Sequence, residues 1–264
     1  MREIARQSEK FLHGYFNEEF YDFERNGEAG LIAAIVRERS SGPLFVLDVG
    51  AHKGDWAKAV LTRKPDAVIY CFEIVPALAR MVRNCLAGYP TAYVCDYGLS
   101  SASHEVEVFW NKTWDTMSAI APRHEDQAFV GTDVTRIAAH VKTGDEVVTH
   151  LRNPKVDLIK IDVEGHEIEV LSGFQKTLKS PELRPRIIQF EYGQTWLPSR
   201  HALQEAYMLL EPAGYVIGRL HPDGVDFKAY AFKDDHFRMG NHVAMLADDP
   251  LRAKIAHFEH RNPR

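Results

Sequence analysis

The chain has 264 residues, of which 45% are hydrophobic and 26% are charged, as in folded globular proteins and unlike in disordered ones. Its 32 Lys and Arg against 37 Asp and Glu give a formal net charge of −5, which argues against nucleic acid as the main partner. No apolar run approaches the roughly 18 residues of a membrane span, and the charged start MREIARQSEK lacks the apolar stretch of a signal peptide. The three cysteines are widely spaced, so we expect a cytoplasmic protein with reduced thiols.

Residues 1–43 are predicted to form an N-terminal helical segment that ends at the breaker Ser41-Gly42-Pro43. Several aromatic residues crowd its first half, more than one short helix can bury against a sheet. We therefore expect this segment to cover a substrate pocket or to form a homodimer contact. A plain core helix is the alternative.

From Leu44 onward, short apolar runs alternate with amphipathic ones. Five runs are predicted as buried strands, at 44–50, 67–73, 91–99, 156–164 and 184–192. Four amphipathic stretches are predicted as helices, at 54–63, 76–87, 166–179 and 199–211. This alternation predicts an α/β fold with a doubly wound, mostly parallel sheet and helices on both faces, whose ligand site lies at the carboxyl ends of the strands.

Residues 44–250 are expected to form one domain, with an insertion at 100–155 that is too long for one crossover helix. Two segments of this insertion, 105–111 and 145–151, are predicted as extra strands around a polar loop, a candidate substrate cover. Near the end of the chain, strands at 215–220, 228–232 and 242–248 are predicted to form an antiparallel edge of the sheet. Residues 251–264 are expected to form a C-terminal helix and tail.

The first strand runs into a glycine loop with the spacing D-x-G-x-x-x-G, from Asp48 to Gly54. Gly50 allows a sharp turn, and Gly54 allows a ligand to approach the start of the next helix. The loop differs from the G-x-G-x-x-G of dinucleotide binders, because His52 stands where the second glycine would be. Asp48 would repel a phosphate but suits a cationic amino group, such as the ammonium of a methionine-type ligand.

Acidic residues also stand at the ends of the next two strands. Glu73 is positioned to accept both hydrogen bonds of a ribose diol, and Asp96 to reach the edge of an adenine ring, on which Tyr97 and Leu99 could pack. Together with Asp48, they describe a pocket for adenosine with a charged amino-acid tail and no phosphate. S-adenosylmethionine fits that description.

The fourth strand carries charges where a central parallel strand should be apolar. Lys160, Asp162 and Glu164 share one face, so Lys160 is expected to neutralise one of the carboxylates. An internal salt bridge that only fixes the strand is the structural alternative. Gly165 then starts a helix, close to His166.

Four segments in this order, LDVGAHKGDWA, YCFEIVP, VDLIKIDVEGHEIEVLSGF and IIQFEYG, resemble the FkbM-type S-adenosylmethionine-dependent methyltransferases. The resemblance covers residues 44–193, and GNHVAMLAD (240–248) is similar to the family's closing strand. It implies a class I, Rossmann-like methyltransferase fold and O-methylation of a hydroxyl on a small molecule, a natural product or a sugar of a glycan. The family usually has Asn where this chain has His52.

Carried onto this chain, the resemblance implies that Asp48, Gly50 and Glu73 bind the cofactor and that Asp162 lies beside the methyl donor. The full set of predicted cofactor-binding residues is Asp48, Gly50, Ala51, His52, Gly54, Glu73, Ile74, Asp96, Tyr97, Gly98 and Asp162. The stretch 114–118 stands where the family has a serine-containing loop near the acceptor. The predicted substrate-binding residues are therefore Trp114, Thr116, Met117 and Ser118.

A hydroxyl that receives a methyl group must lose its proton, so a base is expected at the tips of the fourth and fifth strands. His166 is the first choice, because its ordinary pKa is near neutrality. Asp162, Glu164 and Glu191 are the other catalytic candidates, and Glu164 or Glu191 could be the base itself or orient His166. The histidines are scattered and form no HExxH pattern, so no metal is expected.

Two other functions stay open on the sequence. A nicotinamide-dependent oxidoreductase is disfavoured by Asp48 and by the missing second glycine. A non-catalytic, methyltransferase-like binding module is disfavoured by the intact cofactor loop.

Overall fold

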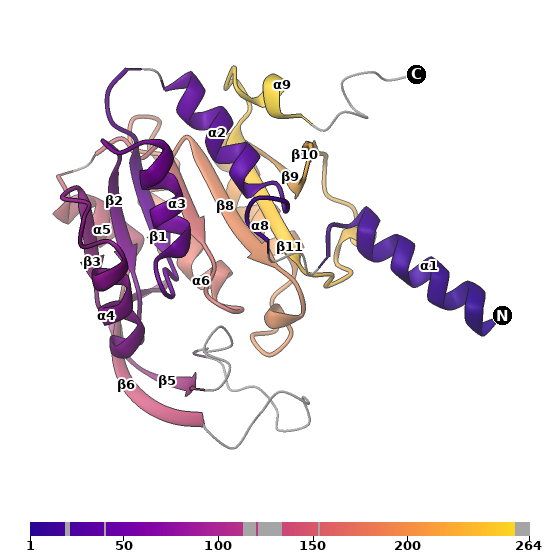
Figure 1. The fold of residues 1–264 in the computed structure, drawn as a ribbon, viewed down its shortest axis with the longest axis horizontal. Helices are drawn as coiled ribbons and strands as arrows, with labels where there is room; N and C mark the ends of the chain where they lie inside the picture. The colour runs from indigo at the N-terminus through magenta and orange to yellow at the C-terminus, as the bar shows by residue number, and fades with distance from the viewer. Residues whose placement is uncertain (19–21, 40, 113–119, 121–133, 153, 257–264) are drawn as a thin grey trace.

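A central eight-stranded sheet organises the chain (Figure 1). The computed structural model describes residues 1–18, 22–39, 41–112, 120, 134–152 and 154–256. The strands of the sheet are β1 (Phe45–Val49), β2 (Val68–Phe72), β3 (Ala92–Cys95), β7 (Leu158–Ile161), β8 (Ile187–Tyr192), β9 (Tyr215–His221), β10 (Gly224–Phe227) and β11 (Gly240–Leu246). Their order is β10-β9-β11-β8-β7-β1-β2-β3, in which β3, β2, β1, β7 and β8 pair in parallel and β11 and β10 pair antiparallel to their neighbours.

Helices cover both faces of this sheet, as predicted for a doubly wound fold (Figure 1). One face carries α2 (Glu28–Glu38), α3 (Asp55–Arg63) and α4 (Pro76–Cys85). The other carries α5 (Gly144–His150), α6 (Glu167–Ser172), α7 (Gln175–Lys179) and α8 (Leu203–Leu210). The short helix α9 (Arg252–Ile255) follows the sheet, and 3-10 turns lie at Gln194–Trp196, Glu211–Ala213 and Phe232–Asp234.

Burial on both faces explains why the parallel strands are continuously apolar. Val46 belongs to the core under α2, α3 and α4, and its neighbour Leu47 belongs to the core under the opposite helices, both with no exposed surface. Because β1 lies between β2 and β7, the chain changes winding direction at β1. The carboxyl ends of β1 and β7 therefore border the crevice where such sheets bind ligands.

The insertion differs from its prediction. Residues 145–151 do not form a strand: Gly144–His150 is helix α5, which begins with a capping box in which Glu146 N–H donates to Thr143 Oγ1 at 3.1 Å and Glu146 Oε2 accepts from Thr143 N–H at 3.4 Å. The strand that pairs with β5 (His104–Asn111) is β6 (Val134–Lys142), in a second sheet of order β4-β6-β5. The predicted strand 105–111 is confirmed.

Three further boundaries were predicted wrongly. The stretch 91–99 is two strands, because β3 ends at Cys95 and Gly98–Leu99 is β4 of the second sheet. The strand at 228–232 is absent, since β10 (Gly224–Phe227) already pairs with β9 through a tight turn. The helix at 166–179 is divided into α6 and α7 near Gly173, where an added Cβ would lie 2.2 Å from the Ser100 carbonyl oxygen.

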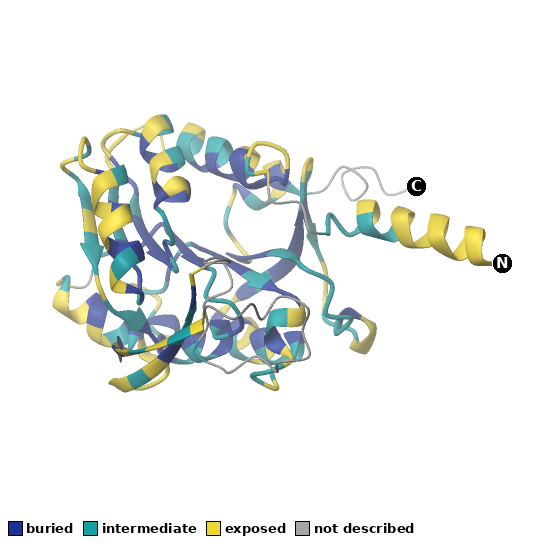
Figure 2. Ribbon diagram, turned by 60° about the horizontal axis from the view of Figure 1, so that its bottom comes forward, coloured by how far each residue is buried: buried dark blue, intermediate teal, exposed yellow. Residues whose placement is uncertain are grey.

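The N-terminal segment contains two helices in different environments. Helix α2 packs on the sheet, whereas α1 (Arg2–Tyr15) has no buried residue and projects from the body (Figures 1 and 2). Phe11 is 70% exposed and Tyr15 54% exposed. The roles predicted for this segment, as a pocket cover or a homodimer contact, stay predictions. In the described part of the chain, no helix has both the length and the apolar character that a bilayer crossing requires.

The capping box of α5 is tested by Thr143→Ala, which removes the side chain that accepts from Glu146 N–H. We expect the free energy of unfolding to fall by about 1 kcal/mol and the Tm by about 2–4 °C. Thr149→Ala is the matched control, because the Thr149 hydroxyl only donates to the Asp145 carbonyl within the same helix. Equal losses for both variants in thermal and denaturant unfolding would contradict the assignment of Thr143 as the cap.

Candidate functional site

The loop after β1 is held between the ends of two neighbouring strands. The N–H groups of Gly50 and Ala51 both donate to the Phe72 carbonyl oxygen, at 3.0 and 3.1 Å. Gly50 has a φ of 84°, and an added Cβ would lie 1.8 Å from the Asp162 carbonyl oxygen. Only glycine fits this position, so the close approach of β1 and β7 depends on it. His52 and Gly54 also have positive φ values, 51° and 89°, which turn the loop into the start of α3.

Glu73 closes the other side of this loop. One carboxylate oxygen accepts from His52 N–H at 2.8 Å and the other from Val75 N–H at 2.9 Å. Burial raises the pKa of Glu73 to about 7, although these two hydrogen bonds lower it. Each oxygen keeps a second lone pair, so the carboxylate is fixed in place and still has acceptor capacity for a diol.

Asp48 has no exposed surface, and neither of its carboxylate oxygens has a hydrogen-bond partner. The nearest cation is Lys160, whose Nζ is 4.0 Å from Oδ1. Burial raises the pKa of Asp48 to about 6, against the lowering effect of Lys160. A buried carboxylate without hydrogen bonds is costly, and a ligand ammonium would supply the missing donors. The residues around the loop thus fit the amino-acid tail and ribose of S-adenosylmethionine.

The residues predicted for the adenine side follow β3. Asp96 is largely exposed and pairs with Arg83 at 3.3 Å. The Tyr97 ring packs against Phe72 and lies under Lys142 Nζ, which is 4.4 Å from the ring centroid. Ile74 packs on Gly98, where an added Cβ would be 2.9 Å from its Cδ1.

Leu99 was expected to pack on the adenine, but it is buried in the core beside the strands. The predicted substrate-binding residues Trp114, Thr116, Met117 and Ser118 lie outside the described residues.

Lys160 links the cofactor loop to the tip of β7. The β1–β7 register pairs it with Asp48, and its Nζ donates to Asp162 Oδ2 at 3.0 Å. The Nζ also lies 5.7 Å from the centroid of the Trp56 ring. Burial lowers the pKa of Lys160, but the carboxylates of Asp162 and Asp48 raise it by more than burial lowers it. The ammonium therefore stays charged. The predicted neutralisation of a carboxylate by Lys160 is present as the pair with Asp162.

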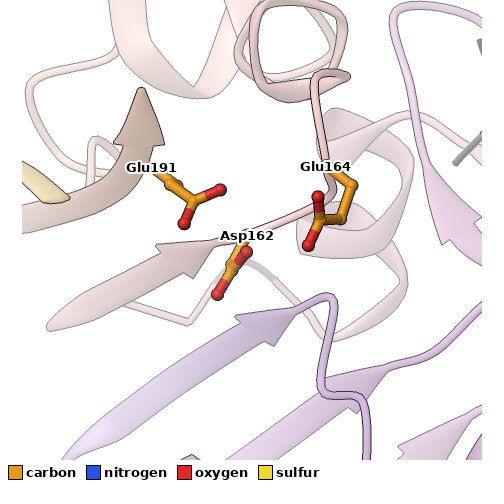
Figure 3. Close-up of side chains that lie close together, drawn as sticks. All are labelled: Asp162, Glu164 and Glu191. Atoms are coloured by element: carbon orange, nitrogen blue, oxygen red, sulfur yellow. The ribbon is translucent and has the colours of Figure 1, made fainter. Parts of the chain in front are cut away.

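Three carboxylates converge next to this pair (Figure 3). Asp162 follows β7, Glu164 lies on the loop after it, and Glu191 is on β8. One oxygen of each lies within 4.8 Å of the others. Burial raises the pKa of Glu191 well above its usual range, and the neighbouring carboxylates of Asp162 and Glu164 add to this effect. Among the described residues, no other group of three or more acidic, histidine or cysteine side chains is as close.

His166 is outside this carboxylate cluster. Its Nε2 is 2.9 Å from Ser100 Oγ, next to β4. Burial lowers the pKa of His166 to about 4, with Glu169 acting in the opposite direction. The structure therefore brings together three of the four catalytic candidates and places the fourth against the second sheet.

Glu167 was missed by the sequence analysis. It has no exposed surface, and its carboxylate accepts from Val163 N–H and Gly165 N–H, both at 3.0 Å. These two donors flank Glu164, a non-glycine residue with a φ of 57°. Glu167 thus holds the strained turn that presents Glu164 to the cluster. A carboxylate two residues after a glycine, at the start of a short helix, is the sequence signal that could have indicated this role.

Residues 48–217 match the Methyltransferase FkbM domain, which is well over half of the chain. The chain belongs to the FkbM methyltransferase family. The prediction from the sequence motifs is thereby confirmed, as is the S-adenosylmethionine cofactor, and the nicotinamide oxidoreductase alternative loses its support.

The chain is also similar in sequence to two named methyltransferases. The hexuronic acid methyltransferase AglP of Haloferax volcanii is 31% identical over 157 residues, which are 58% of this chain and 59% of AglP. The 2-O-methyltransferase NoeI of Sinorhizobium fredii is 24% identical over 190 residues, which are 69% of this chain and 76% of NoeI. The match thus spans less than two thirds of AglP.

Among solved structures, the plantazolicin methyltransferase BamL, in complex with a triazolic analog and SAH, superposes with a TM-score of 0.50 at 9% identity over 86% of each chain. This likeness concerns the fold alone. It agrees with the predicted class I methyltransferase fold.

The role of Glu167 is tested by removing its carboxylate. Glu167→Ala leaves the N–H groups of buried Gly165 and partly buried Val163 without acceptors, so we expect the free energy of unfolding to fall by about 2 kcal/mol. Glu167→Gln keeps one acceptor oxygen and should lose about half as much. Denaturant unfolding measures both. Equal stability of all three proteins would contradict the proposed hold on the turn.

The raised pKa of Glu73 predicts a pH dependence of cofactor binding. Ionised Glu73 offers acceptors to both ribose hydroxyls, so binding favours the ionised form. With a pKa of about 7 in the free protein, affinity for S-adenosylhomocysteine should rise roughly tenfold between pH 6 and pH 8 and then level off. Titration calorimetry measures this change. Glu73→Gln should bind ~1–3 kcal/mol more weakly and lose most of the dependence, keeping only the smaller part that comes from Asp48. A flat wild-type profile would count against the ribose contact.

Proposed function

We propose that this protein is an O-methyltransferase that acts on a hydroxyl of a sugar or a sugar-like small molecule. The observation that carries the proposal is the carboxylate cluster of Asp162, Glu164 and Glu191, immediately beside the cofactor loop. Carboxylates accept hydrogen bonds from hydroxyls. The names of the two relatives, a hexuronic acid methyltransferase and a 2-O-methyltransferase, support an acceptor of this class.

When bound, S-adenosylmethionine supplies a methyl group that moves from sulfur to the acceptor oxygen, and the hydroxyl proton must pass to a base. The chain contributes position and proton acceptance. Gly50 brings the cofactor loop against the backbone of Asp162, so the cofactor edge and the carboxylate cluster adjoin. Holding both reactants in one geometry can remove several kcal/mol, up to about 7–11, from the barrier to such a transfer.

We assign proton acceptance to the carboxylate cluster. Glu164 and Glu191 reach the same small volume from two elements, whereas the His166 imidazole already contacts Ser100 Oγ. A base must be within hydrogen-bond reach of the hydroxyl. Glu191 is the stronger candidate, because its Oε2 is buried without a hydrogen-bond partner.

The reaction class is tested with S-adenosylmethionine that carries a deuterated methyl group and a panel of sugars, uronic acids and glycosides. We expect a labelled product from a hydroxyl-bearing sugar, with the methyl group located on oxygen by mass spectrometry and NMR. Methylation of a carboxylate, a nitrogen or a carbon, with no ether product from the panel, would contradict the proposal.

The base is tested with two isosteric variants on the acceptor so identified. Glu191→Gln should lower kcat by ~100-fold or more, because the amide cannot accept the proton, while affinity for S-adenosylhomocysteine stays within about threefold. His166→Gln is the comparison, since glutamine can keep the hydrogen bond to Ser100, and its kcat should stay within about tenfold of the wild type. The reverse order of the two losses would make His166 the base.

A further inference from the structure

The carboxylate cluster has more acidic groups than cationic groups acting on it. Besides Asp162 and Glu164, the buried carboxylate of Glu167 acts on Glu191, and Lys160 is the cation that opposes them. The Lys160 ammonium is already 3.0 Å from Asp162 and 4.0 Å from Asp48. One ammonium therefore faces several carboxylates, and a bound cation would compensate the charge that Lys160 does not.

Glu191 has a carboxylate oxygen without a hydrogen-bond partner in this arrangement. Part of the residue is exposed, but its Oε2 has neither solvent contact nor a hydrogen-bond partner. Its side chain points from β8 toward Asp162 and Glu164 (Figure 3). Native structures have few buried oxygens without a hydrogen-bond partner, and a bound ion is one common reason for such an oxygen.

We propose that Asp162, Glu164 and Glu191 bind a divalent cation of the hard, oxygen-preferring class, such as Mg²⁺ or Mn²⁺. Carboxylate oxygens are the ligands that these ions select. Oxygens bound to one octahedral Mg²⁺ are separated by about 3 Å when adjacent and about 4.2 Å when opposite. The three oxygens here lie within 4.8 Å of one another, so small side-chain movements would close the site.

Three protein ligands leave about half of an octahedral coordination sphere for water or acceptor oxygens. A vicinal diol of a sugar has the matching chemistry, with two neutral oxygens at adjacent positions. The cation would orient the hydroxyl and favour loss of its proton. Since each carboxylate contributes one oxygen, a second oxygen of Glu191 stays available to accept that proton. This catalytic role rests on the proposed function, but binding of the cation does not.

Binding is measured on the chelator-treated, full-length protein with Mn²⁺ alone, without cofactor or acceptor. Loss of the free Mn²⁺ signal in electron paramagnetic resonance should show about one site per chain, with a Kd on the order of 10⁻⁵–10⁻⁴ M. Mg²⁺ should compete for this site. Glu191→Gln and Asp162→Asn should each weaken Mn²⁺ binding at least tenfold.

Glu107→Gln is the matched control, because Glu107 is an exposed carboxylate on β5 that pairs with Arg136. It should bind Mn²⁺ as the wild type does. Binding of S-adenosylhomocysteine checks that Glu191→Gln and the control are folded.

Absence of saturable Mn²⁺ binding to the wild type, or binding unchanged in both cluster variants, overturns the metal site. Ether formation without any metal binding would refute this inference and leave the proposed function intact. Metal binding without methylation of any hydroxyl would support this inference and refute the proposed function.

Discussion

Lys160 lies between Asp48 and Asp162 at the boundary of β1 and β7, and the rest of the site depends on this buried charge. A desolvated ammonium requires carboxylates on both sides, and those carboxylates in turn require a cation. The strand register supplies the contact, because Asp48 and Lys160 are direct neighbours in the parallel pair. Replacing Lys160 would leave several buried acids with less compensation. The charge thus ties the end of β1 to the end of β7.

Two backbone features, the glycine turn after β1 and the turn after β7, bring the two sides of the site together around that charge. Gly50 allows the loop after β1 to approach the Asp162 carbonyl more closely than any side chain permits. Glu167 holds the turn after β7 through the N–H groups on either side of Glu164. The first shapes the loop proposed to hold the cofactor, and the second shapes the turn that carries Glu164, on the proposed acceptor side. Both hold backbone conformations with positive φ, at Gly50 and at Glu164, and such conformations cluster at functional sites.

The sequence predicted the sheet and the cofactor edge well, because both follow from local patterns. Apolar runs on both strand faces indicated a parallel sheet, and the D-x-G-x-x-x-G spacing placed Asp48 and Gly50 at its carboxyl edge. The insertion was less predictable. The apolar content of residues 145–151 fits a strand or a helix equally, and the capping box at Thr143 decided for the helix. Glu167 was overlooked because its carboxylate binds only main-chain groups.

By itself, the sequence determined the fold class, the methyltransferase family and the order of acidic residues along the strand ends, since these depend on periodicity and short motifs. Only the tertiary structure decided which of those acids meet. Glu191 is 27 residues or more from Asp162 and Glu164 in the chain, and strand pairing of β7 with β8 brings it to them. The same packing places the His166 imidazole against Ser100, which is 66 residues earlier in the chain. Side-chain direction at a strand tip depends on long-range register and burial, which local patterns do not encode.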